Sequence, residues 1–141
     1  GQYNYARCMQ REDEVAATLA LNEFIDQTLS LLYLLNKKYK PYYKWSYYGL
    51  KDCTCLQAVT PLLLQLVQLP SQKQHWPQKN NIINTDDQKV VLIEKICQLV
   101  IGELHRQGLS TSDDDFLDNH TLEVMSHIQD DHIRMKHVME G

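Results

Sequence analysis

Glycine is scarce in this chain, which has five glycines among 141 residues, two of them at the chain ends. The other three, Gly49, Gly102 and Gly108, are isolated from one another in sequence. Loops that hold phosphate through backbone N–H groups need closely spaced glycines. The sequence therefore excludes a glycine-rich phosphate loop of any kind within these residues.

Paired cysteines and long apolar runs are also missing. Of the four cysteines (Cys8, Cys53, Cys55 and Cys97), only Cys53 and Cys55 are close, as C-x-C. Zinc sites usually show two spaced pairs, so small, buried, reduced thiols are the favoured interpretation. The longest apolar stretch, "LSLLYLLN", is too short to cross a membrane, and the first residues lack the apolar core of a signal peptide. We expect a cytoplasmic protein without membrane contact.

The composition is that of a globular protein, with 43% hydrophobic and 23% charged residues. The length predicts a single domain spanning residues 1–141. The net charge is −4, which argues against nucleic acid as a partner of the whole molecule.

Apolar residues recur at intervals of three and four, which predicts an all-α fold: a helical bundle of four main helices plus short extra helices. The expected segments are 12–38, a short helix at 41–48, a helix with Thr60 as N-cap, a helix from about 86 to Gly108, and a last helix over 113–137. Residues 70–85 form the expected loop. In the first helix the predicted buried stripe begins with Val15 and Leu19.

Lysine and aromatic side chains are concentrated between Leu34 and Asp52, "LLNKKYKPYYKWSYYGLKD". This stretch holds five lysines, five tyrosines and a tryptophan. Ammonium groups attract phosphate, and aromatic faces stack on bases or sugars, so a phosphate-bearing ligand would suit it. The alternative is that the rings pack a short helix onto the bundle while the lysines are solvated.

Arginines and acids meet near the start of the first long helix. Arg7 and Arg11 could clamp an anionic ligand beside a catalytic carboxylate such as Glu14. Helix capping and surface ion pairs explain the same residues equally well.

Histidines and acids near the C-terminus fit a metal site poorly, and we predict none. His120, His127, His132 and His137 are spaced seven, five and five apart, whereas helical ligand pairs sit three or four apart. The acids of "SDDDFLD" suit a helix start, with Ser112 and Asp115 in capping-box spacing.

Residues 3–45 resemble the helical region of the DUF4037 family. The motif R-C-x-x-R at Arg7–Arg11, followed by L-L-N-K-x-Y-x-P-Y-Y-K-W, carries the resemblance. The segment "DDDFLDNHTLEVMSHIQDDHIRMKHVMEG" is similar to the C-terminus of the same proteins. They are predicted nucleotidyltransferases, in which a catalytic domain with a Gly-Ser loop and an Asp-x-Asp metal pair precedes a helical domain. That helical domain is similar to the C-terminal domain of kanamycin nucleotidyltransferase.

This chain lacks a Gly-Ser loop followed by Asp-x-Asp, so the resemblance implies the C-terminal helical domain of a longer enzyme. The implied partners are the N-terminal catalytic domain of the same chain, a nucleotide and a small-molecule acceptor. Mg²⁺ is implied for the full-length enzyme and no cofactor for these residues, which would lack independent catalysis.

The resemblance also implies roles for single residues. Glu14 is the candidate catalytic carboxylate. The candidate substrate- or nucleotide-binding residues are Arg7, Arg11, Lys37, Tyr39, Tyr42, Lys44 and Trp45. Some of these side chains could instead bury against the catalytic domain, and apolar surface left without that domain could drive homodimer formation. The alternative function is a non-catalytic protein-interaction or toxin–antitoxin-type helical module.

Overall fold

The computed structural model of the chain describes residues 1–76 and 81–136. The helices are α1 (Asn4–Gln10), α2 (Glu14–Leu35), α3 (Tyr43–Ser46), α4 (Val59–Gln68), α5 (Gln88–Arg106), α6 (Thr121–Ser126) and α7 (Asp131–Arg134). Short 3₁₀ helices are η1 (Tyr48–Asp52), η2 (Lys73–His75) and η3 (Leu117–His120). No strand occurs in the described ranges, which confirms the all-α prediction. The chain forms two compact units, residues 1–96 and residues 97 onward, with the division inside α5.

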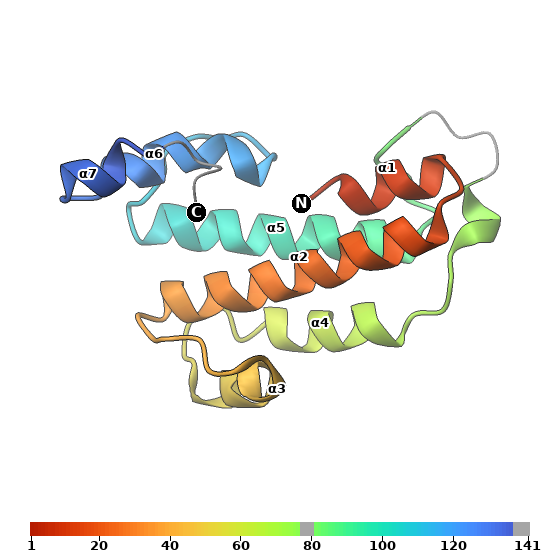
Figure 1. Ribbon diagram of the computed structural model, residues 1–141, viewed down its shortest axis with the longest axis horizontal. Coiled ribbons are helices and arrows are strands. Elements are labelled where there is room, and N and C mark those ends of the chain that lie inside the picture. Colours follow the sequence, from red (N-terminus) through yellow and green to blue (C-terminus); the bar gives the residue numbers. More distant parts are fainter. Residues whose placement is uncertain (77–80, 137–141) are drawn as a thin grey trace. The chain divides into compact units, whose positions relative to one another are not determined.

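The first unit begins with a helix that the sequence pattern did not predict. Helix α1 packs against α2 (Figure 1), and the two are joined by a tight turn in which Glu12 has a φ of 58°. Asp13 then caps α2, because its Oδ1 accepts a hydrogen bond from the Ala16 N–H at 2.9 Å. The predicted start of this helix at Glu12 is therefore two residues early.

The buried face of α2 differs from the predicted stripe at its N-terminal end. Val15 and Leu19 are 74% and 64% exposed, so the expectation that they are buried is wrong. Ala17 is buried in their place, and the predicted position Leu21 is buried. A large side chain at 17 would hold α1 away, so the small alanine permits the close packing of α1 on α2. Further along, the predicted positions Phe24, Leu29, Leu32 and Leu35 are buried.

Buried Asp87 fixes the start of α5. Its Oδ1 accepts a hydrogen bond from the Lys89 N–H at 2.8 Å, so Asp87 caps α5, close to the predicted helix start at about residue 86. Its Oδ2 accepts from the Trp76 indole N–H at 2.6 Å and the Tyr5 hydroxyl at 2.9 Å. Burial and the neighbouring Asp87 raise the pKa of Tyr5 well above its ordinary value. One carboxylate thus ties α1 and the end of the 70–76 segment to α5.

The observed ends of other helices agree with the predicted ends only in part. Gly108 ends α5 as predicted, with a φ of 69° and the Leu109 N–H donating to the Leu104 carbonyl at 2.9 Å. Helix α4 begins at Val59 after Ala58, so Thr60 is not its cap. The predicted loop over 70–85 contains η2, and its residues 77–80 lie outside the described ranges.

The second unit contradicts the prediction of one continuous helix over 113–137. Its described part has an extended segment, then η3, α6, a break and α7. Asp114 turns the chain by accepting hydrogen bonds from the Phe116 N–H at 2.8 Å and the Asn119 side-chain amide, so Ser112 and Asp115 cap no helix. Asp130 accepts from the N–H groups of His132 and Ile133 and starts α7 anew. His137 and Val138 lie outside the described residues. Where the chain is described, no helix combines the length and apolar character that a membrane span needs.

Candidate functional site

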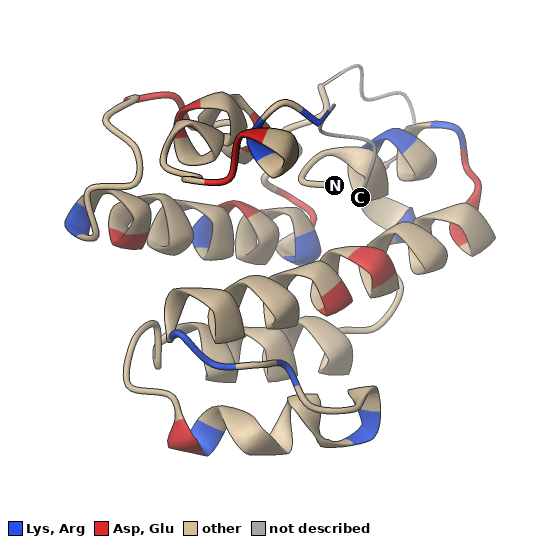
Figure 2. Cartoon of the chain, turned by 60° about the vertical axis from the view of Figure 1, so that its left-hand side comes forward, with Lys and Arg blue, Asp and Glu red and all other residues tan. Residues whose placement is uncertain are grey.

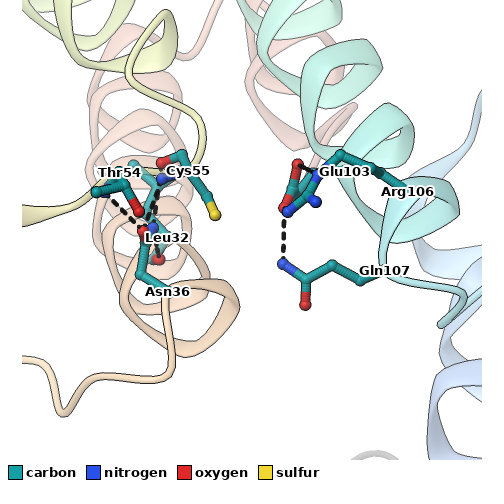
Figure 3. Close-up of polar contacts among 7 residues, drawn as sticks. All are labelled: Leu32, Asn36, Thr54, Cys55, Glu103, Arg106 and Gln107. Atoms are coloured by element: carbon teal, nitrogen blue, oxygen red, sulfur yellow. Dashed lines mark hydrogen bonds and ion pairs between the residues drawn. The ribbon is translucent and has the colours of Figure 1, made fainter.

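Residues 37–51, named here the lysine–aromatic segment, follow the end of α2 within the first unit. The chain comes back to the end of α2 at Thr54 and Cys55. Asn36 closes both ends of this excursion (Figure 3). Its side-chain amide N–H donates to the carbonyls of Leu32 at 2.8 Å and Cys55 at 3.1 Å. Its Oδ1 accepts from the N–H groups of Thr54 at 2.9 Å and Cys55 at 2.8 Å. One half-buried side chain therefore fixes the base of the segment.

A second anchor lies in the middle of the segment. The buried Tyr33 of α2 donates its hydroxyl hydrogen to the Ser46 carbonyl at 2.8 Å. A Cβ on Gly49 would lie 2.4 Å from the Tyr33 Oη, so only glycine fits at this position. Leu50 and Cys53 are buried next to this contact, and burial raises the pKa of the Cys53 thiol. The segment is therefore held on α2 by a buried hydrogen bond, a glycine in close contact and two buried side chains.

Its large rings point to solvent instead. Tyr39, Tyr42 and Trp45 are 101%, 66% and 62% exposed. These three are the predicted aromatic ligand-binding residues, and none of them packs into the core. Tyr39, Tyr42 and Trp45 therefore do not attach the short helix to the bundle. Ser46 and Leu50 do so, and the Tyr47 hydroxyl adds a hydrogen bond to the Thr60 carbonyl of α4 at 3.2 Å.

The rings and lysines form two clusters. In the Tyr42 cluster, Tyr42 and Tyr43 have centroids 4.6 Å apart, and the Lys44 Nζ lies 5.9 Å from the Tyr43 centroid. In the Trp45 cluster, Trp45 and Tyr48 meet edge to face at 6.5 Å, and the Lys51 Nζ lies 3.9 Å from the Tyr48 centroid. Each cluster thus combines two aromatic rings with one ammonium group.

The remaining lysines of the segment differ in their surroundings; Figure 2 colours the lysine and arginine positions of the chain blue along the backbone. Lys40 forms an ion pair with Asp26 of α2 at 2.5 Å and contacts Ser30, which makes it a third anchor. Lys38 donates a hydrogen bond to the Asp52 carbonyl. The two predicted ligand-binding lysines, Lys37 with a φ of 56° and Lys44, are both exposed.

Glu14 lies in a polar cleft of about 180 Å³ in the first unit, at the opposite end of α2. The cleft is lined by Tyr5, Met9, Glu14, Ala17, Thr18, Leu21, Ser71, Gln72 and Lys89. Glu14 pairs with Lys73 at 3.0 Å and accepts a hydrogen bond from the Ser71 hydroxyl at 2.9 Å. The hydrogen bonds from Lys73 and Ser71 lower the pKa of Glu14, and the same contact raises the pKa of Lys73.

The structure does not bring the predicted residues into one site. Glu14 is the first residue of α2, whereas Lys40 of the lysine–aromatic segment contacts this helix at Asp26, which is 26 − 14 = 12 residues and so about 18 Å further along at about 1.5 Å per residue. Arg7 and Arg11 are exposed near the Glu14 end, where one Arg11 nitrogen contacts the Cys8 sulfur at 3.5 Å, and neither lines the cleft. The predicted set therefore divides into a surface and a cleft.

A second hollow in the first unit, of about 380 Å³, holds none of the predicted residues. It is lined by Gln65, Gln68, Leu69, Gln88, Val91 and Leu92. Because this lining has no ionisable side chain, it offers no acid–base chemistry.

The second unit contains a buried polar network that sequence reasoning missed. The Ser110 Oγ lies 2.6 Å from the His120 Nδ1 and donates to the Glu123 Oε2 at 2.8 Å, while the His120 Nε2 lies 2.7 Å from the Asp114 carbonyl. Ser110 and His120 are buried, so this arrangement stabilises a turn and does not present a nucleophile.

Glu123 completes this network by binding the backbone. Its carboxylate accepts hydrogen bonds from the N–H and hydroxyl of Thr111 at 2.8 and 2.7 Å. These bonds, with that from Ser110, lower the pKa of Glu123 to about 2.

Figure 3 shows a further local contact set, in which Glu103 accepts hydrogen bonds from Arg106 and Gln107. Among the residues described, no group of three His, Cys, Asp or Glu side chains could hold a metal ion.

The signals for the missed anchors were present in the sequence. Asn36 stands at the end of an apolar helix pattern, where asparagine often caps, and Gly49 interrupts a run of aromatics. Neither signal reveals its distant partner, because those contacts depend on the tertiary fold.

Comparison with known proteins gives one partial match. Residues 1–46 match the family model described as "Domain of unknown function (DUF4037)". The match covers α1, α2 and the chain as far as the end of α3, and so includes all eight predicted site residues. No curated protein and no solved structure matches the chain.

Proposed function

We propose that this chain is a helical substrate-binding domain of a nucleotidyltransferase. It would position an acceptor for transfer of a nucleoside monophosphate by a catalytic domain outside these residues. In this proposal Mg²⁺ is held by that catalytic domain, because the described residues offer no metal-binding group of their own. The DUF4037 match over residues 1–46 supports the choice of family and leaves the activity to be tested.

The observation that carries the proposal is that the lysine–aromatic segment is rigidly anchored while its rings are exposed. Burying large aromatic rings is a main source of folding free energy, so displaying them to water has a cost. Three anchors, at Asn36, Tyr33 and Lys40, hold the backbone that displays them. A preorganised set of rings and ammonium groups suits a ligand with a π face and a phosphate.

Glu14 has a different place in this proposal. Its lowered pKa keeps the carboxylate charged, which favours binding of hydroxyl or ammonium groups and weakens it as a proton acceptor. A role in holding the acceptor therefore fits its surroundings better than the role of base, which stays a prediction. Arg7 and Arg11 lie exposed near the same end of α2, where they could face the catalytic domain.

A thermal-shift titration with the four nucleoside triphosphates, with and without Mg²⁺, tests the proposal. A ligand that binds only the folded state raises the melting temperature. We expect a concentration-dependent rise that Lys44→Ala and Trp45→Ala abolish. The matched control is Lys95→Ala, which removes an exposed lysine from α5. No rise for any nucleotide, or a rise that both segment variants retain, would contradict a nucleotide site at this surface.

A protein-interaction module is the second candidate, since exposed tyrosine and tryptophan are enriched at protein interfaces. The same surface could support a homodimer. Sedimentation velocity over a wide protein concentration range distinguishes this case. Association that Trp45→Ala removes, in a protein that binds no nucleotide, would favour it.

A further inference from the structure

The two clusters of the lysine–aromatic segment repeat one composition along the chain. The Tyr42 cluster (Tyr42, Tyr43 and Lys44) is followed directly by the Trp45 cluster (Trp45, Tyr48 and Lys51). Each combines a contacting pair of rings with an ammonium group within 5.9 Å or 3.9 Å of a ring centroid. Each could therefore stack one base and pair with one phosphate. Two such clusters in succession fit a polymeric ligand that carries a base and a phosphate in each repeating unit.

The exposure of the rings argues against a small ligand as the only occupant. Small-molecule sites are concave and bury most of the ligand surface. Tyr42 and Trp45 are 66% and 62% exposed, and the two hollows described in the first unit are lined by other residues. One nucleotide would be covered on one side only, whereas a strand gains from each further stacked base.

The charge of the segment favours an anionic polymer. Five of the 14 lysine and arginine residues of the chain, and none of its 18 acids, lie within residues 37–51. The net charge of −4 argued against nucleic acid, but charges are screened over about 8 Å in physiological salt, so a strand responds to the local charge. Among the described residues, the ion pair found for a lysine of this segment is that of Lys40 with Asp26.

We propose that the lysine–aromatic segment binds single-stranded nucleic acid, with successive bases stacked on the Tyr42 and Trp45 clusters and the intervening phosphates paired with Lys44 and Lys51. This inference deepens the proposed function and rests on it for the surface involved. It makes the ligand of the lysine–aromatic segment a polynucleotide strand, not a single nucleotide.

Fluorescence anisotropy with labelled ten-nucleotide single strands, one of uridine and one of thymidine, tests the inference. Unlabelled uridine and thymidine monophosphates and a ten-base-pair duplex serve as competitors. We expect each strand to bind at least tenfold more tightly than its monophosphate and more tightly than the duplex. A preference between the two strands identifies RNA or DNA as the natural source.

Variants assign the binding to the segment. Loss of one stacked base weakens binding about 5- to 150-fold, which we expect for Trp45→Ala, while Trp45→Phe keeps most of the affinity. Lys44→Ala should reduce the slope of log K against log salt by about 0.7, the value for one phosphate contact of a single strand. Lys95→Ala should leave affinity and slope unchanged, and circular dichroism confirms that each variant is folded.

Three outcomes would overturn the inference. If a strand binds no better than its monophosphate, the surface is a site for a single nucleotide and not for a polymer. The proposed function would then survive. Strand binding that Trp45→Ala does not weaken would place the strand elsewhere. No binding of either strand would also reject the inference, and the triphosphate titration then decides independently whether the proposed function stands.

Discussion

At the scale of single residues, Asn36 has the largest influence on the candidate surface. It uses both polar atoms of its side chain, and the backbone groups it satisfies are 18 and 19 residues away in sequence. Most asparagines at helix ends cap only their own helix. Here the same residue also closes the excursion that displays the aromatic rings.

Replacing Asn36 by alanine should destabilise the first unit. The variant removes the acceptor of the exposed Thr54 N–H and of the part-buried Cys55 N–H, together with the hydrogen bonds that Asn36 donates to the Leu32 and Cys55 carbonyls, and a typical hydrogen bond contributes about 0.5–1.5 kcal/mol. We expect the free energy of unfolding in urea to fall by about 2 kcal/mol. Asn22→Ala, at an exposed position of α2, is the matched control and should change it by less than about 0.5 kcal/mol. Equal effects of the two substitutions would show that the contacts of Asn36 contribute little.

At the scale of elements, the sequence predicted helices well where local and tertiary signals agree. Helix α5 combines a buried apolar face with Gly108 at its end, and both features follow from periodicity and glycine conformation. The α2 prediction erred at Val15 and Leu19 because the position of α1, which decides which face is covered, has no local signature. The prediction of one helix over 113–137 was wrong because the side chains of Asp114 and Asp130 accept hydrogen bonds from nearby backbone N–H groups. Asp114 turns the chain, and Asp130 starts a new helix.

The element scale also gives a pH dependence, through Glu123 in the first turn of α6, whose carboxylate binds Ser110 and Thr111. Its folded pKa of about 2 lies below its ordinary value of 4.5. A depressed folded pKa adds stability above the unfolded value, and that contribution is lost as the pH falls through the folded one. The stabilisation by Glu123 should therefore be complete above about pH 4.5 and absent near pH 2.

Urea unfolding of the wild type and of Glu123→Gln, at several pH values from 7 to 2, measures this dependence. We expect the wild type to be more stable at neutral pH and the difference between the two proteins to narrow on acidification until it vanishes. Because both proteins share every other carboxylate, the difference isolates Glu123. A gap that is constant with pH would contradict the assigned hydrogen bonds.

At the scale of the whole molecule, sequence reasoning found the candidate residues but not their grouping. Lysine and aromatic residues crowd one stretch, and that density is visible without a structure. The exposure of these side chains was not visible in the sequence. It depends on Tyr33, Ser46 and Gly49, which attach the segment to α2 in place of the large rings. The separation of Glu14 from the segment follows from their places along α2, a helix that the sequence did predict.

The central claim is that the lysine–aromatic segment is a binding surface and not part of the core, and the stability of Trp45→Ala tests it most directly. We predict a free energy of unfolding in urea within about 0.5 kcal/mol of the wild type, because Trp45 is 62% exposed, together with loss of the nucleotide-induced rise in melting temperature. A loss of about 3 kcal/mol or more, as for a buried aromatic, with no nucleotide effect in the wild type, would show that the ring is structural and would contradict the account.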